Sequence, residues 1–482
     1  MKIYKLFFIW SAFLALFSCK KVIEIKETDF IGGDVALKTV ENNEQAIIGA
    51  YAGVNVEMGI LLNSYFADEV RKSPEFYNAA TTHEWQYGTT DVTIRDNFVA
   101  LSPMYAVIDR ANRVLGALPN ADSTRTGDNN LKSRLRGEAL FLRAYAHFEL
   151  FRFYCDVYSP TGLGMPYMDE PSIKPQARIE MAPYFSKIKA DLTEAKGLLP
   201  NSLADVFRAN RLAVSGLQAR IALYMRDWTN AVTYSTEFIN AIPLANIATF
   251  PGIWQRSGDF DVSNAESAFK LKKTNVVGGR LGSLFRGVSA SSTNIGTVVW
   301  IPTDALWNSY DQVNDVRFSS FLKSEPLLTA AGRQPRIVQK YAGTGYGTAN
   351  ENVADAKVLR TAEMYLIRAE ARAELGSISG SNSAESDINT LRANRITGYT
   401  PVTFTSKQEA IDAIMLERFK ELPFEGHRFW DLKRRGLPVV RTGIDAPTPA
   451  AATLPAGHFR FTLPIPDPEM KANPLMQQNP GY

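Results

Sequence analysis

The chain has 482 residues, 45% of them hydrophobic and 21% charged, so it can bury a large core in one or two compact bodies. Lysine and arginine number 53 against 50 acidic residues, a formal net charge of +3. A chain this close to neutrality has no electrostatic reason to bind nucleic acid, and we expect none as a partner. Cysteine is scarce, with only Cys19 and Cys155.

Residues 1–18 are typical of a secretory signal, because two lysines precede an apolar run. The Leu16-Phe17-Ser18-Cys19 segment then resembles the bacterial lipobox, where cleavage leaves the cysteine first and its sulfur carries a diacylglycerol. The sequence therefore predicts lipidation of Cys19, followed by a polar tether over residues 19–40. The alternative is a plain signal peptide with a chance cysteine.

A long helix is predicted from about Arg136, because small and large apolar residues recur at three- and four-residue spacing up to the breakers of Ser159–Gly162. It is apolar around most of its circumference, so we expect it at the centre of the fold. Cys155 near its end is interpreted as a buried small hydrophobe rather than a catalytic thiol. No later span is long and apolar enough to predict a transmembrane helix.

Nine further helices are predicted by the same periodicity, over 43–54, 61–71, 104–118, 184–199, 210–225, 228–239, 358–375, 384–395 and 407–422. The adjacent pair 210–225 and 228–239 resembles a tetratricopeptide unit. The spacing E-x4-R-A-x-A occurs at Glu138 and again at Glu363, as stacked helical units would require. The predicted fold is mostly α, a tetratricopeptide-like helical-repeat scaffold.

Residues 241–348 differ in character, since they are rich in Gly, Ser, Thr and Asn and lose helical periodicity. We interpret them as an irregular, loop-rich insertion with short strands and helices, of a length that is usually functional. The scaffold would then comprise 41–240 and 350–435, with a Pro-rich tail over 436–482. All of 41–482 is predicted to form one domain.

Four segments in order carry a family resemblance: the central helix with its GMPY turn, LRTAEMYLIRAEARAELG, ERFKELPFEGHRFWDLKRRG and the ending LPIPDPEMKANPLMQQNPGY. Together they resemble the SusD/RagB family of Bacteroidetes outer-membrane lipoproteins, over essentially the whole chain. The resemblance implies a helical scaffold with a variable loop-rich face. It also implies a lipid-anchored, cell-surface protein that binds nutrient glycans and sits on a TonB-dependent transporter of the SusC type.

The residues that follow Cys19 bear on whether the protein is exposed at the cell surface. Lys20-Lys21 directly follows Cys19, and the acidic residues come later. If acidic residues next to the lipidated cysteine direct export, then outer-membrane anchoring is better supported than exposure at the cell surface.

The candidate glycan-binding residues are loop aromatics with nearby polar groups. An aromatic ring covers the apolar face of a sugar, while charged and amide groups bond its hydroxyls. The candidates are Asp68, Arg71, Trp85, Tyr87, Trp254 and Trp300. The alternative for each ring is a place in satellite core under a long loop.

Two other function classes stay open. A lipoprotein glycosidase would need two carboxylates at a fixed separation, and no motif singles out such a pair. His427 and Asp431, with Glu425 nearby, could hold a metal or act in hydrolysis, although a structural salt-bridge network is the favoured interpretation. No cofactor or metal is therefore expected. The third class is a scaffold that binds only protein or peptide.

Overall fold

The computed structural model describes residues 36–74, 82–276, 279–287, 298–446 and 448–482. The signal segment, Cys19 and most of the tether lie outside these ranges. Helices dominate the described chain, and its strands are short and paired two by two, which confirms the mostly α prediction.

The first half of the chain is helical with one short strand. Its elements are α3 (Val40–Ala52), α4 (Glu57–Phe66), β1 (Val70–Lys72), α5 (Val92–Asn97), α6 (Leu101–Ala117), η3 (Leu118–Asn120), α7 (Asp128–Tyr154), α8 (Met181–Leu198), α9 (Arg211–Met225) and α10 (Trp228–Ala241).

The middle of the chain contains short elements joined by loops. They are α11 (Phe250–Trp254), β2 (Arg256–Ser257), β3 (Phe260–Asp261), β4 (Ser267–Leu271), α12 (Ser283–Arg286), β5 (Trp300–Pro302), α13 (Asp304–Asn308), α14 (Val316–Phe321), β6 (Leu322–Ser324), α15 (Pro326–Ala330) and β7 (Arg336–Val338).

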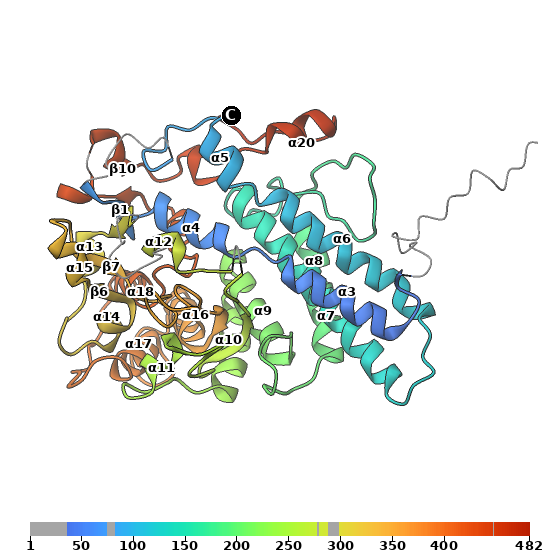
Figure 1. The fold of residues 1–482 in the computed structure, drawn as a ribbon, viewed down its shortest axis with the longest axis horizontal. Helices are drawn as coiled ribbons and strands as arrows, with labels where there is room; N and C mark the ends of the chain where they lie inside the picture. Colours follow the sequence, from blue (N-terminus) through green and yellow to red (C-terminus); the bar gives the residue numbers. More distant parts are fainter. Residues whose placement is uncertain (1–35, 75–81, 277–278, 288–297, 447) are drawn as a thin grey trace, which may run out of the picture.

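The last third returns to helices. Its elements are β8 (Ala356–Arg360), α16 (Thr361–Glu374), α17 (Ala384–Ala393), α18 (Lys407–Glu421), α19 (Arg428–Arg435), β9 (Val439–Val440), η4 (Gly443–Asp445), η5 (Pro449–Ala451), β10 (Thr453–Leu454), η6 (Phe459–Phe461) and α20 (Asp467–Ala472). In Figure 1 helices α3, α6, α7 and α8 form an inclined arm, and strands β1, β6, β7 and β10 lie at the opposite end of the molecule.

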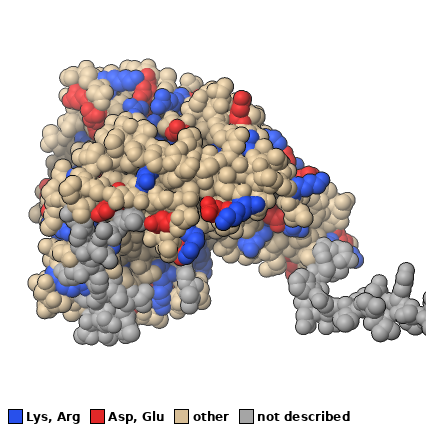
Figure 2. All heavy atoms as spheres, turned by 90° about the horizontal axis from the view of Figure 1, so that it is seen from above, with Lys and Arg blue, Asp and Glu red and all other residues tan. Residues whose placement is uncertain are grey.

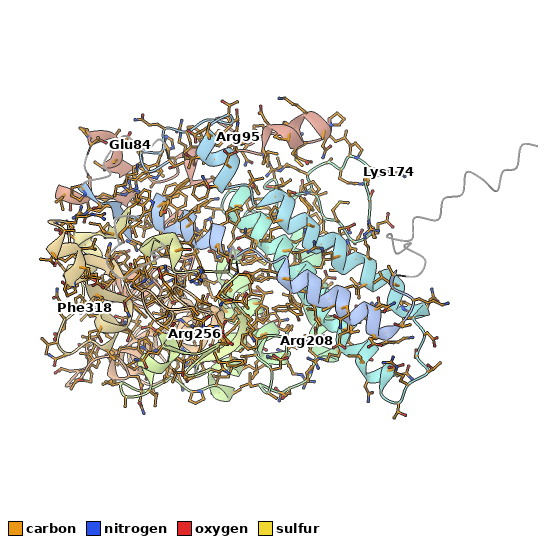
Figure 3. All side chains as sticks on the ribbon, viewed as in Figure 1. Glu84, Arg95, Lys174, Arg208, Arg256 and Phe318 are labelled. Carbon is orange, nitrogen blue, oxygen red and sulfur yellow. The ribbon has the colours of Figure 1, made fainter. Side chains whose placement is uncertain are left out.

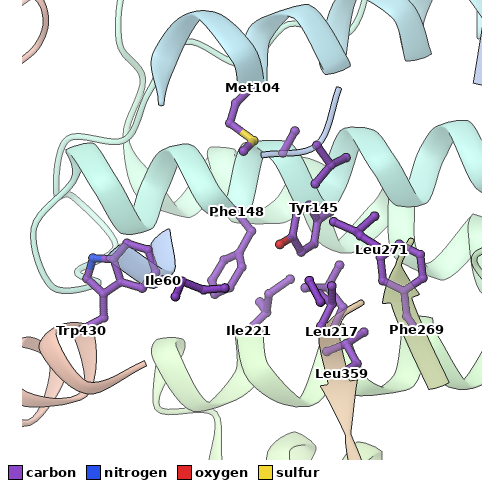
Figure 4. Packing of buried hydrophobic residues seen from close by; sticks show 14 of the residues in the cluster. Ile60, Met104, Tyr145, Phe148, Leu217, Ile221, Phe269, Leu271, Leu359 and Trp430 are labelled. Atoms are coloured by element: carbon purple, nitrogen blue, oxygen red, sulfur yellow. The ribbon is translucent and has the colours of Figure 1, made fainter. Parts of the chain in front are cut away.

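Helix α7 is the central helix, as predicted, and every residue from Gly137 to Tyr154 is buried. It packs between α6 and α8 and also contacts α3 and α9. Figure 4 shows how its aromatic side chains fill the space between these neighbours, in a cluster that includes Met104, Tyr145, Phe148, Leu217, Ile221, Phe269, Leu359 and Trp430. Small alanines on the same helix let the neighbouring backbones approach.

The stretch Val40–Phe66 has the length and mean hydropathy of a membrane-spanning segment. The structure divides it into α3 and α4, helices of 13 and 10 residues, and each is too short to cross a bilayer alone. Both contribute residues to the core, which accounts for their apolar character.

The sequence repeat marks the same ion-pair arrangement at two places. Arg143 on α7 binds both carboxylate oxygens of Asp191 on α8, at 2.7 and 2.6 Å. Arg368 on α16 binds both oxygens of Asp387 on α17, at 2.7 to 3.1 Å. In each case the repeated arginine joins its helix to the next one.

The repeated glutamates also form ion pairs with arginines on or next to a neighbouring helix. Glu138 accepts from Arg208, just before α9, and Glu363 accepts from Arg220 on α9. Arg208 also reaches Glu44 on α3 at 2.6 Å, and Figure 3 shows it beside α3. The repeat therefore encodes the joints between stacked helices.

The surface carries charges of both signs, in keeping with the small net charge. In Figure 2, seen from above, basic and acidic side chains are interspersed with a larger uncharged surface. The same view shows the molecule hollowed on one side, between the body and the helical arm.

A second buried network joins the middle of the chain to the last helices. Glu421 on α18 lies within 3.3 Å of the guanidinium groups of Arg317, Arg360 and Arg395, and all four side chains are buried. These cations lower the pKa of the Glu421 carboxyl despite its burial, so it stays ionised inside the protein.

We predict that Glu421→Ala destabilises the fold by about 3–5 kcal/mol, because three buried guanidinium groups lose a shared partner. Urea unfolding measures the loss. The control is Asp412→Asn on the exposed face of the same helix, for which less than about 0.5 kcal/mol is expected. Equal stability of the two variants would show that the network contributes little.

Glu69, between α4 and β1, is buried and accepts from Ser64 Oγ at 2.7 Å and from the Phe424 backbone N–H at 3.0 Å. Burial raises the pKa of this carboxyl from 4.5 to about 7. The folded protein therefore holds a proton that the unfolded chain releases between these two pKa values, so this group's contribution to stability falls as pH rises through that window.

We predict that Glu69→Gln removes this dependence. From about pH 5 to about pH 8 the variant gains stability relative to the parent protein by on the order of 3 kcal/mol, at about 1.4 kcal/mol per pKa unit. Urea unfolding across the pH range measures the difference. Parallel stability curves for the two proteins would contradict the prediction.

Candidate functional site

A pair of short strands brings distant segments together at one end of the molecule. β1 and β5 pair antiparallel, with Lys72 opposite Trp300. The pairing extends at both ends, since the Ser73 N–H donates to the Val299 carbonyl at 2.8 Å and Thr303 Oγ1 donates to the Asp68 carbonyl at 2.7 Å. Trp300 therefore occupies a defined position next to the end of α4.

Trp300 and Tyr65 form a stacked pair, which we name the Trp300 platform. The ring centroids lie 3.8 Å apart with an interplanar angle of 29°, and both side chains are half-buried. The Lys72 ammonium lies 5.8 Å from the Trp300 ring centroid. The platform thus combines two aromatic rings with a cationic hydrogen-bond donor, which suits a ligand with apolar faces and polar edges.

His83 lies next to this platform, with its ring centroid 5.4 Å from that of Trp300. Its Nδ1 is 2.9 Å from the Tyr65 carbonyl oxygen, which can only accept, so Nδ1 carries the proton. Burial and the Arg441 guanidinium hold the pKa of His83 well below 6.5. The imidazole is therefore neutral at physiological pH.

Arg441 braces the segments that carry the platform. Its guanidinium donates to the backbone carbonyls of Tyr65 at 3.0 Å, Ala67 at 2.7 Å and His83 at 2.6 Å. It also lies 4.3 Å from the Trp85 ring centroid. One buried side chain thus fixes the end of α4 to the loop that follows β1.

Trp85 is part of this support. Its indole N–H donates to the Phe66 carbonyl at 2.9 Å, and its backbone adopts φ +54, a left-handed conformation that is strained for a bulky residue. Tyr87 is also buried, and its hydroxyl donates to the Arg460 carbonyl at 2.9 Å. Both rings hold the loop against the C-terminal segment.

The two predicted charged residues are similarly engaged. Asp68 accepts two hydrogen bonds from Arg428, at 2.8 and 2.7 Å. Arg71 lies 3.2 Å from Asp445, whose carboxylate in turn accepts from the first backbone N–H groups of α13. These pairs fasten β1 to the last part of the chain.

Trp254 lies in the core of the inserted region. Its ring packs edge-on against Phe321 at 5.3 Å, and the Lys340 ammonium lies 4.3 Å from its centroid. The ring is buried, so its contacts are those of the core, which is the alternative considered for each aromatic candidate.

Of the six candidate residues only Trp300 is not buried. The exposed fractions of the others are 8% for Asp68, 2% for Arg71, 4% for Trp85, 0% for Tyr87 and 5% for Trp254. A ring must be exposed to stack on a sugar, so Trp300 stays the ligand-contacting candidate and the rings of Trp85, Tyr87 and Trp254 are interpreted as support and core. Asp68 and Arg71 are interpreted as support because each is buried and paired with an oppositely charged side chain.

Tyr65 and Lys72 were not among the predicted site residues. Both lie in or next to the helix predicted over 61–71, whereas in the structure α4 ends at Phe66 and β1 begins at Val70. Their importance depends on pairing with a strand far along the chain, for which the local sequence carries no signal.

The hydrolytic candidates belong to the scaffold. Asp431 accepts from Arg418 at 2.6 Å and from Arg434 at 2.8 Å, and Glu425 pairs with Arg360 and Lys340. His427 is buried, which lowers its pKa well below 6.5. In the part of the chain that the structure describes, no cluster of three or more His, Cys, Asp or Glu could hold a metal ion.

A separate cleft of about 470 Å³ lies between α6, residues 166–176 and α20. It is lined by a mixture of apolar and polar side chains, including Tyr105, Met168 and Glu469. None of the six candidate residues lines it, and it has no stacked aromatic pair of the kind seen at Trp300.

Two family models match the chain. The model described as "SusD family" matches residues 332–482, and the model described as "Starch-binding associating with outer membrane" matches residues 34–223. SusD-like protein P2 of Formosa agariphila is 24% identical, with the whole of both chains covered.

Solved structures share the fold over almost the whole chain. A SusD superfamily protein from Bacteroides thetaiotaomicron superposes with a TM-score of 0.76 at 23% identity, covering 92% of this chain and 100% of the other. A laminarin-binding SusD-like protein superposes with a TM-score of 0.69 at 22% identity, with coverage of 92% and 100%. The ordered motifs, the two matching models and the shared architecture show that the chain belongs to the SusD/RagB family.

Proposed function

We propose that this protein is a carbohydrate-binding lipoprotein of the outer membrane that captures a nutrient glycan on the Trp300 platform. The stacked pair of half-buried rings beside Lys72 is the observation that carries the proposal. The exposed part of the Trp300 ring can cover a sugar's apolar face, Tyr65 stacked against it holds the ring in place, and the Lys72 ammonium supplies a donor for hydroxyl oxygens. A matching model named for starch binding and a laminarin-binding relative support the same ligand class.

The finer part of the proposal concerns location and partner. Lipidation at Cys19 would anchor the protein in the outer membrane, at the cell surface, and the glycan would pass to a TonB-dependent SusC-type transporter. Membership of the family and the lipobox-like Leu16–Cys19 support this arrangement. The same reasoning favours a binding protein over a glycosidase, since the carboxylates around His427 are committed to ion pairs.

We predict that Trp300→Ala weakens glycan binding at least about tenfold, corresponding to ~1.4 kcal/mol, because one half of the stacked pair is removed. Affinity electrophoresis and calorimetry of the soluble form from Lys20, against starch, laminarin and a wider polysaccharide panel, measure the loss. Product analysis on the same samples checks for hydrolysis.

The matched control is Tyr234→Ala on α10. Tyr234 is also half-buried and also has a lysine near its ring, with Lys196 Nζ 5.2 Å from the centroid. It should leave binding unchanged. Equal losses in both variants would remove the platform from the site, released oligosaccharide would favour the glycosidase, and no binding across the panel would refute the glycan proposal.

The anchor has its own test. We predict that Cys19→Ser moves the full-length protein from the membrane fraction to the soluble fraction, because the acyl chains have no other point of attachment. Fractionation with immunoblotting measures the shift. Retention of the variant in the membrane fraction would contradict lipid anchoring at this cysteine.

A further inference from the structure

The hairpin of β2 and β3 presents an aromatic ring to solvent. Phe260 is 60% exposed and its neighbour Val262 is 56% exposed. The exposed part of such a ring contributes nothing to folding, because that apolar surface is not removed from water. Such a residue in a fixed position is a candidate contact for a ligand.

The hairpin is held rigidly from below. Arg256 donates to the Asp259 carbonyl at 2.7 Å and to the Lys273 carbonyl at 3.2 Å, and its guanidinium also lies near the carboxylate of Asp261. Figure 3 marks Arg256 in the body of the molecule. The turn itself uses Gly258 at φ +56.

A second brace comes from the loop that leads to β8. Asn350 Nδ2 donates to the Gly258 carbonyl at 2.8 Å and to Asp259 Oδ1 at 3.1 Å. The ring is therefore displayed on a turn that two separate side chains immobilise. A preorganised ring loses little conformational entropy when a ligand binds.

The surroundings of Phe260 suit a saccharide. The Lys272 ammonium lies 4.7 Å from the Phe260 ring centroid and 6.0 Å from that of Phe207, which is half-buried. The exposed part of the ring can cover the C–H face of a sugar, and the ammonium can donate to a neighbouring hydroxyl oxygen.

A series of contacts connects this hairpin to the Trp300 platform. Asn350 belongs to the loop that also carries Tyr346, whose hydroxyl donates to the Arg286 carbonyl at 2.8 Å and whose half-buried ring lies 4.5 Å from the Arg286 guanidinium. Arg286 ends α12, and the Leu284 carbonyl of the same helix accepts from the Tyr65 hydroxyl at 3.3 Å. Phe260 and the platform are thus joined through one loop and one short helix.

We propose that Phe260 is a second saccharide subsite, contacted by a polysaccharide chain whose other part occupies the Trp300 platform. The inference rests on the proposed function and extends it. It assigns the ligand to the class of long glycan chains rather than short oligosaccharides, since the series of contacts from Phe260 to Trp300 passes through Asn350, Tyr346, Arg286 and Tyr65 and one sugar unit cannot cover that series.

The test compares long and short probes on Phe260→Ala. Calorimetry uses laminarin and starch as polymers and laminaritriose and maltotriose as short probes, with the trisaccharide of any other panel polymer that binds. We expect about tenfold weaker polymer binding and a change below about twofold for the trisaccharide. Phe260→Trp, which keeps a ring, should retain polymer binding. Val313→Ala, which trims a side chain that is 90% exposed on another loop, should change neither.

The outcomes separate the two proposals. Loss of polymer affinity alone in Phe260→Ala, with loss for all probes in Trp300→Ala, supports the second subsite. Unchanged polymer binding in Phe260→Ala overturns the subsite and leaves the proposed function intact if Trp300→Ala still loses binding. Absence of glycan binding by the parent protein overturns both. Because Phe260 is exposed, its replacement should leave the fold intact, and thermal unfolding of each variant checks this point.

Discussion

Buried pairs of arginine and carboxylate between neighbouring helices are the constraint on which this architecture depends. Removing such charges from water is costly, and the cost is recovered only when both partners meet in good geometry. Arg143 with Asp191 and Arg368 with Asp387 satisfy this requirement with two-pronged contacts. A helix that shifted along its neighbour would leave a buried charge unpaired. We infer that these pairs fix how the helices stack, while the apolar core supplies most of the driving force.

The same chemistry positions the candidate site. Arg441 donates hydrogen bonds to three backbone carbonyls on two segments. Arg428 pairs with Asp68, and Arg71 pairs with Asp445. These contacts attach β1 and the end of α4 to the C-terminal part of the chain. Tyr65 and Trp300 therefore stack on a rigid support, although neither ring is itself deeply buried.

Much of the scaffold was predictable because its signals are local. The period of apolar residues marked the helices, and the repeated Glu and Arg spacing marked two equivalent joints. The β1 and β5 pairing was not predictable, since two three-residue strands far apart in the chain carry no periodicity. The prediction of a helix over 61–71 was wrong at its end for this reason, because the last of these residues belong to β1 and pair with the distant strand β5.

Which aromatic rings are exposed was not predictable from the sequence for a similar reason. Trp85 and Trp300 both occur in loop-rich sequence, and each has polar neighbours. The Trp85 ring is buried because it packs against Arg441 and its indole N–H donates to the Phe66 carbonyl. Trp300 stacks on Tyr65 instead and stays partly exposed. Composition indicates that a loop region contains rings, but only the tertiary contacts determine which ring faces a ligand.

The residues that stabilise the fold differ from those that are available to contact a ligand. The charged residues that join the helices are buried and paired, so replacing one of them is expected to lower the stability of the fold by several kcal/mol. The rings of Trp300, Tyr65 and Phe260 are partly or largely exposed, and changing them costs the fold much less. Under the proposed function these rings can therefore be altered while the scaffold stays intact, and their position and number, rather than the helices, determine which glycan is bound.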